Sequence, residues 1–177
     1  MKRIIFCSLS LMIALLSPFA KAESRYQIEM LVFSQGLSTT EAFNQTESKI
    51  RWPSALTELS AYEQTDNKAL KGGIAELLNA GEYRLIANLA WVQSTGPGGV
   101  ILPVHIQSTD GNLDGFIHIR NTQQIELIVD LEQKSNQTDS LGKPYLFRLN
   151  EKRPVKLYET QYFDHPKIGV LVRISGV

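Results

Sequence analysis

Hydrophobic and polar residues alternate along much of the chain with a period of two, which is typical of β-strands. The first example is Tyr26, Ile28 and Met30, which alternate with Gln27 and Glu29. Similar alternation, or a short apolar run rich in β-branched and aromatic residues, recurs further along. Eight segments qualify, at 25–33, 83–92, 100–107, 115–120, 124–131, 145–149, 154–162 and 167–174. We expect about seven strands from them.

A single segment, residues 69–79, has the spacing of an amphipathic helix. Its large apolar residues fall on one helical face, and they are Leu70, Ile74, Leu77 and Leu78. The pair Gly72-Gly73 disfavours helix, which suggests a start at Ile74. Gly81 is a natural stop, because glycine readily adopts the left-handed conformation found after helix ends.

Short strands separated by tight turns favour antiparallel pairing. The sequence lacks the alternation of strands and helices that would predict a parallel sheet. The predicted class is therefore α+β: a mainly antiparallel β-sheet of about seven strands with one packed helix. Residues 35–68 are polar and weakly periodic, so we expect a long loop region there. Residues 134–143 are also polar, and we expect a mobile connection.

The first 22 residues have the features of a cleaved secretory signal peptide. Lys2 and Arg3 precede an uncharged apolar run, and Ala20-Lys21-Ala22 has the small-x-small form of a cleavage site. The apolar run is shorter than the roughly 20 residues that span a membrane. We expect a periplasmic protein, with residues 23–177 forming one domain and no membrane span after cleavage.

Charge and cysteine content then exclude several functions. Cleavage would remove three of the 18 basic residues and none of the 18 acidic ones, which leaves a net charge of −3. Such a chain lacks the basic footprint of a nucleic-acid-binding protein. The only cysteine, Cys7, lies in the signal segment. The remaining chain therefore has no disulfide, no thiol nucleophile and no thiolate metal site.

Motifs that would indicate an enzyme are missing from the sequence, which has no GxSxG elbow, HExxH helix, phosphate-binding loop or GxGxxG turn. His105 and His118 flank the turn at 109–112, at positions that would make them neighbours across a hairpin, but two histidines do not make a metal site. A hydrolase that uses one of them remains a minor alternative. We expect no cofactor, no metal and no catalytic residue.

Aromatic side chains that reach the surface would suit sugar rings, because a ring face can pack on the apolar C–H face of a sugar. The candidates are Trp52, Tyr62, Tyr145, Tyr158 and Tyr162. Tyr158 and Tyr162 would share one face of a regular strand over 154–162. Packing within the protein is the alternative for each.

Asp164-His165-Pro166 precedes the apolar run 168–172 near the C-terminus. Proline disfavours helix at the residue before it, and aspartate favours turns. This stretch is therefore predicted to be a hairpin corner that leads into a buried final strand.

The segment ETQYFDHPKIGVLVRI, residues 159–174, resembles the C-terminal signature of the CsiV family. The strand RYQIEMLVF at 25–33 and the helix-to-strand segment 77–93, which ends in Trp91-Val92-Gln93, are similar to family segments in the same order. One position departs from the family pattern: Gln161 stands where the family tends to have histidine. Glutamine does not transfer protons at neutral pH, which argues against catalysis.

The resemblance implies a non-enzymatic periplasmic protein that binds peptidoglycan and supports cell-wall assembly and cell shape. It also implies a partner, a lipoprotein activator of a penicillin-binding synthase. An alternative is a periplasmic protein-interaction scaffold that does not itself bind glycan, in which a sheet edge recruits a partner strand. The glycan- or partner-binding surface is expected near the corner, at Tyr158, Tyr162, Asp164, His165 and Arg173.

Overall fold

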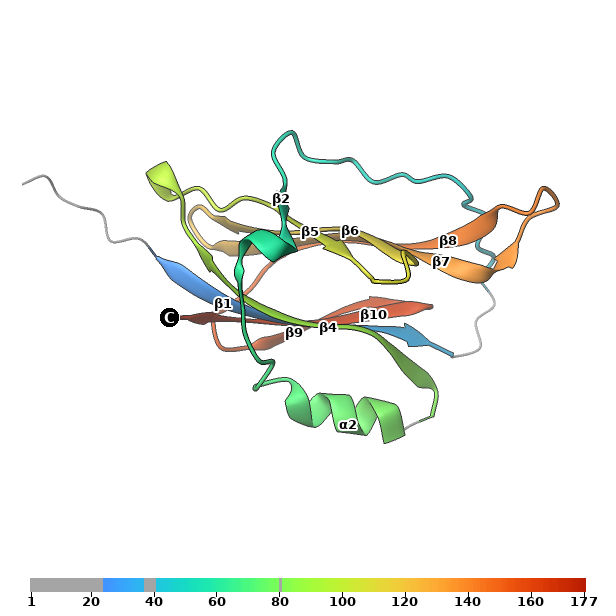
Figure 1. The fold of residues 1–177 in the computed structure, drawn as a ribbon, viewed down its shortest axis with the longest axis horizontal. Helices are drawn as coiled ribbons and strands as arrows, with labels where there is room; N and C mark the ends of the chain where they lie inside the picture. The colour runs from blue at the N-terminus through green and yellow to red at the C-terminus, as the bar shows by residue number, and fades with distance from the viewer. Residues whose placement is uncertain (1–23, 37–40, 80) are drawn as a thin grey trace, which may run out of the picture.

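The computed structural model describes residues 24–36, 41–79 and 81–177. The expected signal peptide lies outside these residues. The described residues form ten strands in two five-stranded sheets (Figure 1). The first sheet has the order β3-β4-β1-β10-β9 and the second β2-β5-β6-β7-β8. The strands are β1 (Arg25–Gln35), β2 (Thr57–Glu58), β3 (Glu63–Gln64), β4 (Tyr83–Ser94), β5 (Val104–Gln107), β6 (Leu113–Asn121), β7 (Ile125–Thr138), β8 (Pro144–Pro154), β9 (Thr160–His165) and β10 (Ile168–Gly176).

Every neighbouring pair of strands is antiparallel except β2 and β5, which pair in parallel over two residues. The α-helix α2 (Lys71–Asn79) and two 3-10 turns, η1 (Leu59–Ala61) and η2 (Pro97–Gly99), complete the described elements. The predicted class, mainly antiparallel sheet with one helix, is confirmed. The two shortest strands, β2 and β3, lie inside the predicted loop region 35–68, where two residues are too few to produce a visible alternation.

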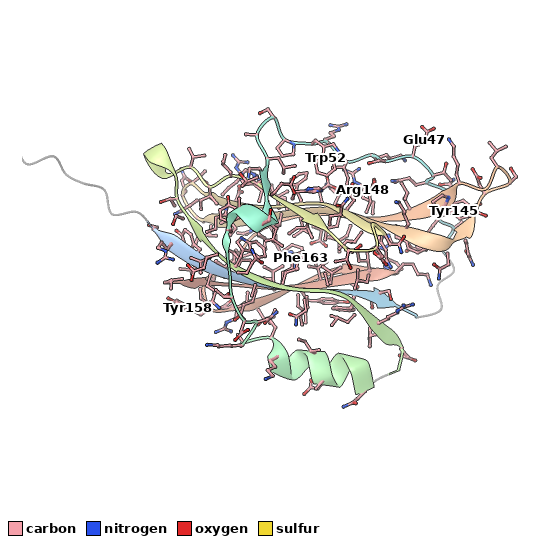
Figure 2. All side chains as sticks on the ribbon, viewed as in Figure 1. Glu47, Trp52, Tyr145, Arg148, Tyr158 and Phe163 are labelled. Carbon is pink, nitrogen blue, oxygen red and sulfur yellow. The ribbon has the colours of Figure 1, made fainter. Side chains whose placement is uncertain are left out.

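The hydrophobic core lies between the two sheets, because each sheet turns its alternate apolar side chains toward the other. Ile28, Met30 and Val32 of β1 are fully buried. From the second sheet, Val129 and Leu131 of β7 join the same cluster. Figure 2 shows Phe163 of β9 in the space between the layers, where it is also fully buried. The inward positions of the long strands thus define the core.

Helix α2 lies against the outer face of the first sheet (Figure 1). It begins at Lys71, before the glycine pair rather than at Ile74 as the sequence suggests. Side chains hold this start in place: the buried Glu29 carboxylate accepts hydrogen bonds from the Lys68 and Ala69 amides at 3.1 and 3.0 Å. These long-range bonds offset the unfavourable propensity of the glycines. Gly81 follows the helix with φ of 70°, as predicted.

Residues 41–56, called here the covering segment, run along the outer face of the second sheet (Figures 1 and 2). Glu132 holds the segment, since its Oε1 accepts hydrogen bonds from Gln45 Nε2 at 2.7 Å and from the Lys49 amide at 2.8 Å. Further along, the Trp52 ring packs on His105 and Phe116 at centroid distances of 5.5 and 6.1 Å. The polar face of the second sheet is therefore partly shielded from water.

Several strand limits differ from the sequence prediction, and the two largest differences are at the end of β7 and before β9. Strand β7 continues to Thr138, so much of the connection predicted to be mobile at 134–143 is β-structure. Residues 155–159 form a turn instead of continuing a strand to residue 162. In both places the side chains on the two faces of the chain are exposed to water or to a polar cleft. Apolar and polar residues therefore do not alternate, and the sequence pattern cannot distinguish a strand from a turn.

Candidate functional site

The predicted corner is a hairpin, because β9 and β10 pair with His165 opposite Ile168. Tyr162 and Asp164 project from β9 on the outer face of the first sheet. The Tyr162 ring stacks on Phe33 at a centroid distance of 6.2 Å, and its hydroxyl donates to Asp164 Oδ1 at 2.7 Å. Gln35 Nε2 donates to the same oxygen at 2.9 Å. These two hydrogen bonds lower the pKa of Asp164, while burial and the Asp164 bond raise the pKa of Tyr162.

His165 leaves the strand on the opposite face from Asp164, so the adjacent pair does not form a joint acid–base site. Its ring packs near Phe43 and Phe147, at centroid distances of 5.3 and 6.3 Å. Its Nδ1 accepts a hydrogen bond from the Lys167 amide at 3.2 Å. Burial lowers the pKa of His165, which favours the neutral ring. The structure therefore gives His165 a packing and turn role.

Tyr158 lies at the other end of β10. It sits in the turn before β9 with φ of 65°, and its amide donates to the Ile174 carbonyl at 2.7 Å. The six residue-to-residue steps from Ile168 to Ile174 span about 20 Å of strand, which separates Tyr158 from Asp164. The expectation that Tyr158 and Tyr162 share one face of a strand is wrong, because the chain turns at Tyr158. Arg173 lies between these ends, opposite Thr160 of β9.

The apolar run after the corner contains a glycine that the packing requires. A Cβ atom at Gly169 would overlap Cε2 and Cζ of Phe33. Phe33 is buried and carries the stacked Tyr162 ring. The glycine in this segment thus allows the Phe33–Tyr162 stack, and the corner motif has a structural reason that involves no catalysis.

The two histidines on the second sheet do not converge. His105 pairs across the ladder with Phe116, two residues from His118. His105 Nδ1 and Nε2 contact Glu58 at 2.9 Å and Asp114 at 2.8 Å, whereas His118 Nε2 donates to the Ile101 carbonyl at 3.0 Å. Within the described ranges, no group of three or more His, Cys, Asp or Glu side chains is arranged to hold a metal ion.

We expect the His105 contacts to make stability pH-dependent. Burial lowers the pKa of His105, but hydrogen bonds to Asp114 and Glu58 outweigh it and raise the pKa above its ordinary value of 6.5. This group's contribution is therefore fully present below pH 6.5 and is lost as the pH rises through the raised pKa. His105→Gln should remove that loss when unfolding free energies are compared from pH 5 to 9.

His118→Gln is the matched control for this measurement. Burial lowers the pKa of His118, so its contribution is lost as the pH falls below 6.5, the opposite direction. If the wild type and His105→Gln have parallel pH profiles above pH 6.5, the assigned role of His105 is incorrect.

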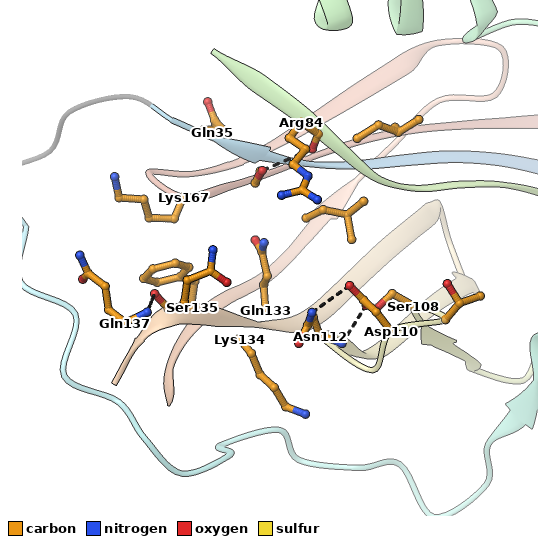
Figure 3. Close-up of a pocket in the computed structure, with 16 residues that line it drawn as sticks. Gln35, Arg84, Ser108, Asp110, Asn112, Gln133, Lys134, Ser135, Gln137 and Lys167 are labelled. Carbon is orange, nitrogen blue, oxygen red and sulfur yellow. Dashed lines mark hydrogen bonds between the residues drawn. The ribbon is translucent and has the colours of Figure 1, made fainter. Parts of the chain in front are cut away.

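A cleft of about 570 Å³ opens between the sheets where the core ends (Figure 3). It arises because the strands continue past the apolar core with the same inward alternation. On β7, Val129 and Leu131 are followed at inward positions by Gln133, and β1 likewise passes from Val32 to Ser34. The lining comprises Ser34, Gln35, Arg84, Leu85, Ile86, Ser108, Thr109, Asp110, Asn112, Gln133, Lys134, Ser135, Asn136, Gln137, Phe147 and Lys167. Amides and hydroxyls dominate this set.

The cleft contains one carboxylate, and that carboxylate is already engaged. Asp110 accepts hydrogen bonds from Ser108 Oγ at 2.6 Å, from the Asn112 amide at 3.0 Å and from Asn112 Nδ2 at 2.8 Å. These bonds, that of Ser108 foremost, lower the pKa of Asp110 to about 2. The remaining lining charges are positive: Arg84, Lys134 and Lys167.

Sequence reasoning did not find this cleft. Ser135, Asn136 and Gln137 of its lining fall in the segment predicted to be a mobile connection, and Gln133 lies just before that segment. The opposite wall comes from β1 and β4, which are distant in the chain. A signal was present, however. The alternate positions 129, 131, 133, 135 and 137 change from Val and Leu to Gln, Ser and Gln. This pattern indicates a strand that leaves the core and continues along a polar surface.

Fold and cleft together define a class: a two-sheet protein with an open polar cleft suited to binding a hydrogen-bonding ligand. The chain belongs to the CsiV family, since the family model described as "Peptidoglycan-binding protein, CsiV" matches residues 54–177. The resemblance seen in the sequence is thereby confirmed. No curated protein and no solved structure matches the chain. Among the described residues, no helix has the length and apolar character needed to cross a membrane.

Proposed function

We propose that this protein binds peptidoglycan in the periplasm without catalysis and thereby supports cell-wall assembly and cell shape. Membership of a family described as peptidoglycan-binding carries the proposal. The expected signal peptide supports the location. We further propose that it acts with a lipoprotein activator of a penicillin-binding synthase, as the family resemblance implies.

The inter-sheet cleft is the binding site we propose. Peptidoglycan consists of amino-sugar strands that carry short peptides, so it offers amide, hydroxyl and carboxylate groups. The cleft offers their complements in amides, hydroxyls and cations. An open cleft also suits a polymer, because a chain can pass through it without being enclosed. All the lining residues except Ser34 and Gln35 fall within residues 54–177, the part of the chain that the family model matches.

We expect the purified protein to sediment with isolated sacculi at low salt over a range of pH. Arg84→Gln should reduce the sedimented fraction, because it removes a cation from the cleft. Lys156→Gln is the matched control: it makes the same charge change in the exposed turn between β8 and β9. Protein that remains in the supernatant under all these conditions would overturn the proposed function.

The Tyr162–Asp164 surface on the other side of the first sheet is proposed as the contact for the protein partner. Tyr162 is 41% exposed and is held in place by Phe33 and Asp164. A pull-down from periplasm that has been cleared of sacculi tests this surface. Tyr162→Ala should lose the lipoprotein partner and keep sacculus binding. Partner capture by a protein that does not sediment with sacculi would instead favour the scaffold alternative.

A further inference from the structure

Two groups in the cleft lack a partner within the protein: one is a hydrogen-bond acceptor and the other is a cation. The Oε1 atom of Gln133 is buried and has no hydrogen-bond partner among the described residues. Across the cleft, Arg84 of β4 is exposed, and none of the ion pairs among the described residues involves its guanidinium. Figure 3 shows both side chains directed into the same space from the two sheets. The cleft thus has one unmet acceptor in its wall and one unmet cationic donor at its surface.

An unsatisfied buried acceptor is costly in a folded protein, and buried polar atoms are paired in nearly all cases. A ligand that meets both groups must bring an N–H donor for Gln133 and an anion for Arg84. Arginine binds carboxylates in a two-point geometry that fits their planar shape. A peptide segment with a backbone amide and a nearby carboxylate supplies both in one molecule.

We propose that the cleft binds a carboxylate-bearing peptide, with Arg84 on the carboxylate and Gln133 Oε1 accepting from a peptide N–H. This inference rests on the proposed function and narrows it. In peptidoglycan, the ligand is the acidic stem peptide rather than the sugar strand.

The positions of the aromatic residues favour the peptide over the sugar strand as the ligand of the cleft. Sugar rings need an accessible aromatic face, and the exposed aromatic side chains Trp52, Tyr158 and Tyr162 all lie outside the cleft lining. The lining contains a single aromatic residue, Phe147. Its ring already packs edge-on with Phe43 at a centroid distance of 5.1 Å and lies near His165.

The charges of the lining support an anionic ligand. Asp110 keeps its negative charge, but it is exposed to water at the far end of the cleft, where solvent screens its repulsion of an anion. Lys134 Nζ donates to the Gly111 carbonyl at 2.9 Å and helps to hold this turn. Lys167 lies at the opposite rim (Figure 3). Arg84 is therefore the cation best placed to contact a ligand in the middle of the cleft.

The test is isothermal titration with three probes: intact soluble muropeptides, stem peptide released from sacculi by an amidase, and the denuded glycan that remains. We expect the stem peptide to bind and the denuded glycan not to bind. The glycan keeps the lactyl carboxylate, so its failure would show that a carboxylate without the peptide is insufficient. Binding of denuded glycan with no binding of stem peptide would overturn the inference and leave the proposed function intact. Failure of all three probes and of sacculi would overturn both.

Variants locate the binding. Arg84→Gln should weaken stem-peptide binding by about ten- to one-hundred-fold, as expected for loss of a charged hydrogen bond. Gln133→Glu keeps the size and the acceptor but adds a negative charge that faces Arg84, and it should abolish binding. Lys156→Gln should bind like the wild type. Urea unfolding verifies that each variant is folded. Unchanged stem-peptide binding by folded Arg84→Gln and Gln133→Glu would place the ligand elsewhere and contradict the proposal.

Discussion

Replacing Arg148 by Met is expected to destabilise the protein by about 3–5 kcal/mol, because it would leave the Asp130 carboxylate buried without its partner. Asp130 is 2% exposed on the covered face of the second sheet. Arg148 Nε and Nη2 each donate to one oxygen of this carboxylate at 2.8 Å. Urea unfolding followed by circular dichroism would measure the change in free energy.

Two further variants separate this effect from a simple change of charge. Lys143→Met removes the same charge from an exposed ion pair with Glu47 at 3.4 Å, and it should change stability by less than about 1 kcal/mol. The double variant Asp130→Leu with Arg148→Met should recover most of the loss, because no uncompensated charge remains. A cost below 1 kcal/mol for Arg148→Met alone would contradict the assigned role of the pair.

Gly115→Ala is the second change expected to have a large effect, at about 3–5 kcal/mol. Gly115 has φ of 148°, a conformation that alanine rarely adopts. A Cβ atom there would overlap the Asp130 carbonyl oxygen and lie 2.8 Å from Leu131 Cα. Both neighbours are backbone of β7, so the β6–β7 ladder would have to separate locally. Unfolding free energies measured with urea provide the test.

Gly111→Ala is the matched control on the same hairpin. Gly111 also has positive φ, at 66°, but its Cβ would meet nothing within 4 Å. Only the conformational cost applies, and we expect about 1–2 kcal/mol. Equal losses for the two variants would show that close approach to β7 is not what makes Gly115 necessary.

The Arg148–Asp130 ion pair and Gly115 both affect β7, the strand that connects the core to the cleft. Asp130 anchors its covered face, and Gly115 allows β6 to approach it closely. Three residues beyond Asp130, the same strand presents Gln133 to the cleft. The site therefore depends on the register of β7, since a shift of one residue would exchange the inward and outward side chains.

The hydrophobic pattern was sufficient to predict the fold class, the helix and the C-terminal hairpin. Alternating residues such as Ile28, Met30 and Val32 must bury one face, and the turn at Pro166 follows from the restricted backbone of proline. These features depend on residues near in the chain. The family resemblance was likewise carried by local segments, above all residues 159–174.

The tertiary structure alone decided how distant residues combine. It separated Tyr158 from Tyr162, because a turn with positive φ replaced the expected strand. It placed Asp164 and His165 on opposite faces, where one bonds to Tyr162 and the other packs among Phe43 and Phe147.

The cleft shows most clearly the difference between what the sequence predicts and what the tertiary structure decides. Gln133 and Arg84 are 49 positions apart in the chain and lie on different sheets. Arg84 belongs to a strand that the pattern predicts, whereas Gln133 lies beyond the predicted strand 124–131, where polar side chains hide the rest of β7. The amino-acid sequence by itself determined which side chains each strand turns inward, because that follows from the two-residue period. Only the packing of the two sheets decided that the polar inward positions would face one another beyond the core, because sheet stacking depends on contacts that no local pattern encodes.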